Sequence, residues 1–283
     1  MKRVRIVFGV WMLAVLGVSA ARAQGTGRSL DIQPGARQNG MGAAGVALIG
    51  DACDAAWWNP AALGFAGTFS AQWTHARLLP RLADLPYDHY SAAVGFRARA
   101  GVAVSGTKLS YGSDSEYEKS VALSVGAQPL SGFALGATVK HIRIHFGPGL
   151  GREGETNGYD FGALDRIRLS PRSSLSFGVN LQNLIGKVSF MNEDVVSPLS
   201  RNLKVGAALD VRLPIPSDQV TMGTLLIADY NQSLVDGSSD FHTWNGGLET
   251  CVGISETARV ALRAGSRWMS DGFRRPETAD STT

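Results

Sequence analysis

The chain has 283 residues, of which 44% are hydrophobic and 18% charged, a composition too apolar for an intrinsically disordered protein. Two cysteines are too few for a disulfide scaffold or a zinc ribbon, and Cys53 and Cys251 are expected to be two isolated buried thiols. The formal net charge is +3, but residues 1–23 hold four basic side chains and no acidic one, so 3 − 4 leaves −1 for the remainder. That balance excludes a basic surface for nucleic acid.

Residues 1–23 read as a secretory signal peptide. A basic start precedes the mostly apolar stretch Ile6–Ala20, and Ala21-Arg22-Ala23 fits the small-x-small cleavage pattern, which leaves Gln24 first. A single membrane anchor is the alternative, but the apolar run is short of the roughly 20 residues that a spanning helix needs. No later segment reaches that length either. The mature chain is therefore expected to be soluble, secreted or a membrane β-barrel.

Residues 24–66 show no strand-like alternation and contain Gly40-Met41-Gly42-Ala-Ala-Gly45. This string matches the dinucleotide-binding pattern G-x-G-x-x-G, but no strand precedes it and no βαβ unit surrounds it, so that function is rejected. Small residues also allow the backbone to fold tightly in a narrow space. The segment is therefore interpreted as a hatch that fits inside a barrel.

The second half of this segment predicts a short helix. Asp51 or Asp54 is placed to cap a helix that leads to Trp57, and Asn59-Pro60 would end it.

From about residue 67 the chain repeats segments of about ten residues in which apolar and small or polar side chains alternate. In the clearest segment Leu175 and Phe177 alternate with Ser176 and Gly178. Period two places each set on one face of a strand, and the short links predict an antiparallel meander. The expected strands, about eleven, lie near 67–78, 88–98, 101–111, 120–127, 133–140, 158–168, 173–183, 203–213, 219–231, 242–254 and 257–268.

The direction in which the apolar faces of these strands point distinguishes two possible all-β folds. A soluble sandwich packs its apolar faces together, whereas a transmembrane β-barrel turns them toward lipid. Strand lengths close to the roughly 9–11 residues that cross a bilayer favour the barrel. So do the small residues of the polar face, which suit a crowded lumen. Aromatic residues near strand ends also match interfacial girdles: Tyr87, Tyr90, Tyr111, Tyr117, Tyr159, Tyr230 and Trp268.

The alternation changes phase after Lys140, where Ile142 and Ile144 become the apolar positions. A β-bulge or emergence from the bilayer would explain the change. The glycine-rich residues 147–158 are expected to form an external loop, and residues 185–200 a second long loop.

The hatch motifs resemble a known family. Arg37-Gln-Asn-Gly-Met-Gly-Ala-Ala-Gly-Val-Ala47, followed by Asp51-x-x-Asp54-Ala-x-Trp57-Trp58-Asn59-Pro60-Ala61, is similar to the opening of the PorV/PorQ outer-membrane proteins, which look related to the FadL-type transporters of hydrophobic compounds. Weaker likeness extends over residues 30–268. The resemblance implies an all-β, antiparallel transmembrane barrel of fourteen strands with an N-terminal hatch. Carried over to this chain, the hatch or gating residues are Gly40, Met41, Gly42, Asp51, Asp54, Trp58, Asn59 and Pro60.

The chain departs from this pattern at its end. About eleven strands are expected in residues 67–268, residues 269–283 form a polar tail, and a bacterial barrel needs an even number of strands and a closed ring. We therefore expect a barrel that lacks its C-terminal strands, through truncation or a frameshift after about Trp268.

Catalytic and metal-binding patterns are weak. His141 and His145 share a strand face without a convergent third ligand, so no metal or cofactor is expected. No G-x-S-x-G nucleophile elbow occurs, and no enzymatic activity is expected. Four charged residues are assigned to the lining of the lumen: Lys140, Asp160, Arg212 and Arg263.

The function implied by the resemblance is uptake or binding of a hydrophobic small molecule in the bacterial outer membrane, with the hatch around Asn59-Pro60 controlling access. The alternative is an accessory barrel of a type IX-like secretion system that binds exported protein cargo. A soluble or structural exported β-protein is the third possibility. The expected partners are outer-membrane lipid and either the small molecule or the cargo, with no nucleic acid.

Overall fold

A computed structural model provides the structure of the chain. It describes residues 26–67, 69–79, 85–96, 99–111, 116–146, 153–189, 196–213, 221–235, 241–254 and 258–270. The expected signal peptide and its cleavage site before Gln24 lie outside the described residues, as do residues 271–283 of the expected polar tail.

Eleven long strands form one antiparallel sheet in which neighbours in the sequence are neighbours in space, and this confirms the predicted meander. Period-two sequences form these strands because alternate side chains then share one surface. The strands are β1 (Ser70–Leu78), β2 (Leu85–Phe96), β3 (Ala100–Ser110), β4 (Glu116–Leu130), β5 (Phe133–Phe146), β6 (Glu153–Ser170), β7 (Ser173–Leu184), β10 (Asn202–Leu213), β11 (Thr221–Ser233), β12 (His242–Gly253) and β13 (Arg259–Met269).

Two loop expectations are corrected. Residues 153–158, assigned to an external loop, begin β6 and pair with β5 from His145 to Lys140. Residues 185–200 contain the short hairpin of β8 (Lys187–Ser189) and β9 (Val196–Pro198). Residues 153–158 are rich in polar residues and glycine, and residues 185–200 in polar residues, so composition indicated loops, whereas pairing with a neighbouring strand decides their conformation.

The phase change after Lys140 involves no β-bulge. The pairing of β5 with β6 is continuous from Phe133 to His145, and Ile142 and Ile144 are buried on the same face as Lys140. They pack with Leu30, Val188 and Leu199 in a small apolar cluster. The side chains change character at this end of the sheet, while the alternation of the backbone continues.

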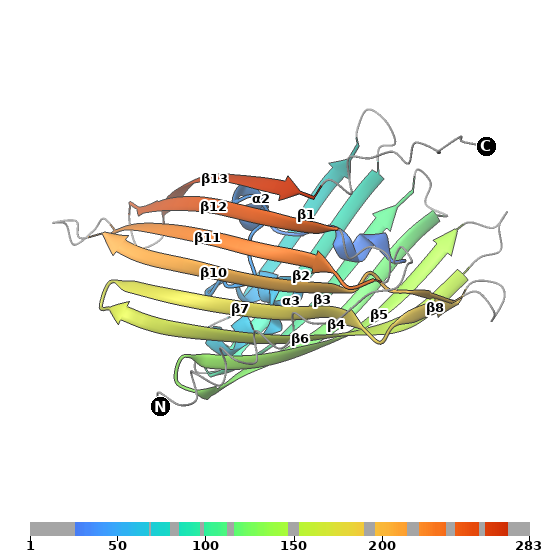
Figure 1. Cartoon of the computed structure of the whole chain (residues 1–283), viewed down its shortest axis with the longest axis horizontal. Coiled ribbons are helices and arrows are strands. Elements are labelled where there is room, and N and C mark those ends of the chain that lie inside the picture. Colours follow the sequence, from blue (N-terminus) through green and yellow to red (C-terminus); the bar gives the residue numbers. More distant parts are fainter. Residues whose placement is uncertain are drawn as a thin grey trace, which may run out of the picture.

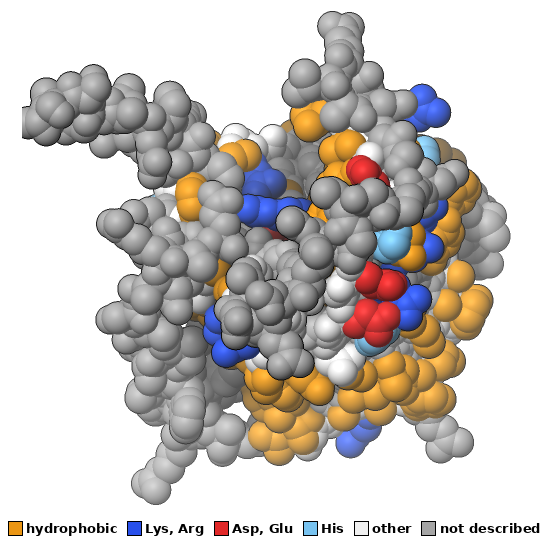
Figure 2. Space-filling model, turned by 90° about the vertical axis from the view of Figure 1, so that its right-hand side faces the viewer, with side chains coloured by type: hydrophobic (Ala, Val, Ile, Leu, Met, Phe, Trp, Pro, Cys, Tyr) orange, Lys and Arg blue, Asp and Glu red, His pale blue; other side chains and the backbone are white. Residues whose placement is uncertain are grey.

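The apolar faces of the long strands point away from the molecule's interior. In β4 Leu123 is 51% exposed and Val125 48%, whereas the neighbouring Ser124 is fully buried. Leu175, Phe177, Leu209 and Val211 are partly exposed, so these side chains are not enclosed between two stacked sheets. In Figure 2, hydrophobic side chains gather along the lower and right-hand outer margin, and charged ones lie nearer the middle.

The sheet is strongly curved and encloses the N-terminal helices on its concave side. Figure 1 shows β10–β13 in front of β1–β5, with α2 and α3 between the two groups. The sheet of eleven strands begins at β1 and ends at β13, and these two strands are not paired with each other. The described sheet is therefore not closed into a barrel. No helix in the described parts of the chain is long and apolar enough to cross a membrane.

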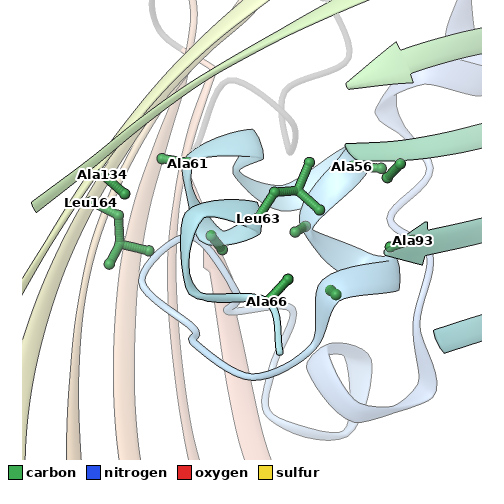
Figure 3. Close-up of a cluster of buried hydrophobic side chains, with 11 residues drawn as sticks. Ala56, Ala61, Leu63, Ala66, Ala93, Ala134 and Leu164 are labelled. Atoms are coloured by element: carbon green, nitrogen blue, oxygen red, sulfur yellow. The ribbon is translucent and has the colours of Figure 1, made fainter. Parts of the chain in front are cut away.

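The segment before the sheet consists of short helices. They are η2 (Arg28–Asp31), α2 (Ala36–Gly40), α3 (Ala52–Trp58) and η3 (Pro60–Phe65). The predicted helix to Trp57 and its end at Asn59 agree with α3. Alanines of α3 and η3 and Leu63 pack against Ala93, Ala134 and Leu164 of the sheet, in the cluster drawn in Figure 3.

Candidate functional site

The hatch rests on a row of glycines that crosses the inner face of the sheet. Gly126, Gly136 and Gly162 are register partners on β4, β5 and β6. A Cβ atom at Gly136 would overlap the backbone of Pro60, and one at Gly162 would overlap the Asn59 side chain. Only glycine allows the backbones to approach this closely. The row thereby fixes the position of Asn59-Pro60 on the sheet.

The Asn59 side chain joins three parts of the chain. Its Nδ2 donates to the carbonyl oxygens of Val46 at 2.9 Å and Ala163 at 3.1 Å, and its Oδ1 accepts from the backbone N–H of Ala61 at 3.1 Å. Asn59 is 1% exposed. Every hydrogen bond is internal to the protein, so a change at this residue would leave buried polar groups unpaired.

The end of α3 is held by amide side chains of β7. Asn180 Nδ2 donates to the Trp58 carbonyl at 2.9 Å, and Gln182 Nε2 donates to the Trp57 carbonyl at 2.6 Å. The last carbonyls of a helix have no partner within the helix. In this protein the sheet supplies the missing donors, which docks the helix in one orientation.

Trp58 is enclosed by the hatch itself. It is 1% exposed, and its indole Nε1 donates to the Pro34 carbonyl at 3.1 Å. Lys204 of β10 places its ammonium 3.9 Å from the ring centre of Trp57 and 5.1 Å from that of Trp58. A cation over an aromatic face is attracted to it, which adds a third link between α3 and the sheet.

A carboxylate of β11 holds the backbone ahead of α3. Asp229 Oδ2 accepts hydrogen bonds from the N–H groups of Gly45 at 2.6 Å and Val46 at 3.0 Å. The last residue of the string Gly40–Gly45 that matched the dinucleotide pattern, and the residue after it, therefore donate to a protein carboxylate.

Arg37 of α2 clamps the hatch to β12. Its guanidinium donates to both oxygens of Glu249, at 2.9 and 2.7 Å, and also to Asp51. Arg263 of β13 donates to Glu249 at 2.6 Å. Burial by itself lowers the pKa of Arg37, but the hydrogen bonds to Glu249 and Asp51 outweigh this effect and raise it, so Arg37 is always charged. The clamp brings together two predicted site residues, Asp51 and Arg263.

Three predicted hatch residues lie against the last two strands. A Cβ atom added at Gly40 would lie 3.3 Å from the Cβ of Arg263, so the two backbones approach closely at this point. Met41 is fully buried over Gly247 and Gly265, and Gly42 has φ +72°, a left-handed conformation that favours glycine. The hatch thus contacts the sheet near both of its ends, since α3 contacts β1 and α2 contacts β13.

The predicted capping role of the two aspartates is wrong. Asp51 occupies the N-cap position of α3 without a capping hydrogen bond, because its carboxylate binds Arg37. Asp54 lies within the helix and accepts from Gln38 Nε2 and Gln72 Nε2, each at 2.8 Å. Burial of Asp54 raises its carboxyl pKa above the ordinary value.

The remaining predicted lumen residues fall into two separate places. Lys140 and Asp160 form a buried ion pair at 2.8 Å, and both also hydrogen bond to Asn183. Arg212 is exposed and lines a pocket that lies away from this ion pair, beside the turn between β6 and β7. Neither place belongs to the clamp.

No metal centre is formed by the described residues, in which no group of three or more potential ligands occurs. His141 lies on the outer face and contacts Asn157, and His145 stacks on Tyr117.

Both cysteines are free, as expected. Cys53 is buried, but Cys251 is only half-buried, which corrects the expectation for that thiol.

Several residues that hold the hatch were missed by sequence reasoning. They are Arg37 in α2 and the inward-facing Asn180, Gln182, Lys204, Asp229 and Glu249 of the sheet. The sequence does hold a signal for two of them, because Asp229 and Glu249 are single acidic residues in otherwise uncharged strands.

Comparison with known proteins found no matching family model and no significant match among curated proteins.

Proposed function

We propose that this chain is an outer-membrane β-barrel protein whose hatch controls the entry of a hydrophobic small molecule. One observation carries the membrane part of the proposal. Along the middle of the strands the inner face buries polar side chains such as Ser124, Asn180 and Asp229, and the outer face exposes large apolar ones such as Leu123, Val125 and Phe161. This arrangement reverses the burial of a soluble protein and suits a surface surrounded by lipid.

Aromatic residues on the outer face support the same placement. Tyr230 and Trp244 lie with ring centres 4.6 Å apart, and Trp73 stacks on Tyr90 at 6.3 Å. Trp73, Tyr90 and Trp244 are more than half exposed. Tyrosine and tryptophan are enriched at membrane–water interfaces because one part of each ring system is apolar and another part is polar. Tyr87 is not part of this surface, because it is buried and donates to the Ile32 carbonyl.

The proposal requires that the edges of β1 and β13 find partners in the bilayer, since unpaired backbone groups are too costly in hydrocarbon. The family resemblance implies a closed ring, in which both of these edges would be paired. The hatch would then fill the lumen, and a solute could pass only if the contacts of Asn59, Asp229 and Arg37 were released.

Two measurements test the proposal. Cell fractionation should recover the chain in the outer membrane as a band whose gel mobility changes on heating; a soluble chain whose mobility does not change on heating would contradict the proposal.

The second measurement tests the hatch. Asn59→Ala with Pro60→Ala should change the uptake of a hydrophobic dye by cells, whereas Asn157→Ala on the outer surface should not. Unchanged uptake in a correctly folded double variant would refute control by the hatch.

A further inference from the structure

A second site lies away from the hatch, beside the turn between β6 and β7. Arg166 and Arg168 come from the end of β6, Arg212 from the end of β10, and Arg172 from the turn itself. Together with nearby serines and Asp210 they line a pocket of about 70 Å³. The pocket is hollowed into the inner face of the sheet, because Arg166, Arg168 and Arg212 continue the inward-facing positions of their strands.

The pairing of the strands fixes this arrangement. Ser174 of β7 is the register partner of both Arg168 and Asp210, so side chains of β6 and β10 approach from its two sides. The N–H of Arg212 donates to the Arg172 carbonyl at 2.8 Å, which ties the turn to β10. The arginines are therefore placed by three adjacent strands and one turn.

The pocket carries an uncompensated positive charge. The described residues that line the pocket supply four guanidinium groups and one carboxylate, 4 − 1, an excess of three. No ion pair within the described part of the chain joins any of the four arginines to an acid. Three interior cations elsewhere in the protein differ, since Arg37 and Arg263 share Glu249 and Lys140 binds Asp160. Cations brought together without a counterion repel one another and attract an anion.

We propose that this pocket binds a single phosphate group. Guanidinium groups present paired N–H donors that match the oxygens of phosphate, and the pocket has room for one such group. The group is either free inorganic phosphate or the phosphate of a lipid headgroup, which share this chemistry. The inference does not depend on the hatch or on dye uptake.

The first experiment titrates the folded full-length chain with inorganic phosphate by calorimetry, at constant ionic strength. Wild type should bind, and Arg168→Gln with Arg212→Gln should bind at least about tenfold more weakly, because charge-assisted hydrogen bonds are lost. The matched control is Arg143→Gln, which removes a positive charge from the exposed far end of β5 and should leave binding unchanged. Asp210→Asn should tighten binding severalfold, because among the described residues that line the pocket Asp210 is the one with a negative charge.

The second experiment places the same proteins in nanodiscs of phosphatidylcholine with or without phosphatidylglycerol and measures retention of the anionic lipid after detergent extraction. Binding of inorganic phosphate that the arginine substitutions weaken identifies free phosphate. Retention of phosphatidylglycerol with the same dependence, without binding of inorganic phosphate, identifies a headgroup. If neither ligand binds, or if the arginine variants bind as well as wild type, the proposal is overturned.

Discussion

Gly136 shows how one residue without a side chain determines a contact between two distant parts of the chain. It lies under the Pro60 backbone with register partners Gly126 and Gly162 on either side. Glycine weakens a strand interior, so three aligned glycines require a compensating gain. The compensation here is the close approach of the hatch backbone.

Replacing Gly136 by alanine should therefore displace the hatch. Its Cβ would overlap Pro60 backbone atoms that cannot move aside without shifting η3. We expect the free energy of unfolding to fall by about 1–3 kcal/mol, the usual effect of overpacking. Urea titration in detergent micelles measures this change. Gly246→Ala is the control, since its Cβ would meet nothing closer than 3.8 Å. Equal stability of the two variants would contradict the proposed role of the glycine row.

Asp54 provides a pH-dependent prediction. Burial raises its pKa above the ordinary 3.8 in the folded protein, despite hydrogen bonds from Gln38 and Gln72. The folded state then retains the proton more strongly than the unfolded chain does. The contribution of protonated Asp54 to the free energy of unfolding is therefore fully present below pH 3.8. It is lost as the pH rises through the raised pKa of the folded state.

Asp54→Asn should remove this contribution to the pH dependence. Urea midpoints measured from pH 4 to 8 should fall less steeply for the variant than for wild type. The asparagine can still exchange hydrogen bonds with Gln38 if the glutamine amide rotates, because Gln38 Oε1 accepts no hydrogen bond from the described residues. Parallel curves for the two proteins would show that Asp54 does not titrate as described.

At the scale of elements, the hatch is attached at separate points along the sheet. Amides of β7 hold the end of α3, Asp229 of β11 holds the loop before it, and Glu249 of β12 holds α2 through Arg37. Releasing one attachment would leave the others in place. A partial displacement at one attachment is therefore easier than expulsion of the whole hatch.

The Arg37–Glu249 clamp should show strong coupling in a double-mutant cycle. The pair is bidentate, and the side chains are 25% and 9% exposed. We expect Arg37→Gln and Glu249→Gln to be coupled by about 1–3 kcal/mol in unfolding experiments. The exposed pair Arg143–Glu155 serves as the control and should show no measurable coupling. Coupling as weak as in that pair would show that the clamp does not hold α2.

The strands were predictable from the sequence because their alternation is local. All eleven appear, and the helix ending at Asn59 follows from Asn59-Pro60. The attachments of the hatch were not predictable, because they join residues up to 212 positions apart, as Arg37 and Glu249 are. The start of β6 was assigned to a loop for the same reason, since only its pairing with β5 makes it a strand. Local patterns identified the elements, and register alone determined which side chains meet.

At the scale of the whole molecule, the reversed burial predicts how the outer face responds to charge. Leu123 is 51% exposed at an outward position of β4, between Val121 and Val125, which are also exposed. In a soluble protein an arginine at such a position changes the unfolding free energy by about 0.5 kcal/mol or less. Near the middle of a bilayer the same substitution on a barrel's lipid face costs about 2–4 kcal/mol. The two environments therefore give clearly different outcomes for Leu123→Arg.

We expect Leu123→Arg to destabilise the protein by about 2–4 kcal/mol when it is folded into phospholipid vesicles. His145→Arg is the matched control, because His145 lies on the same outer face of the adjacent strand, beyond the charged Arg143 and opposite Tyr117. There the apolar band has ended, and the cost should be about 1 kcal/mol or less, as near an interface. Unfolding by guanidinium chloride in vesicles measures both variants. If Leu123→Arg is as stable as wild type, the outer face does not lie against lipid, and the exposed leucines and valines must be covered by protein.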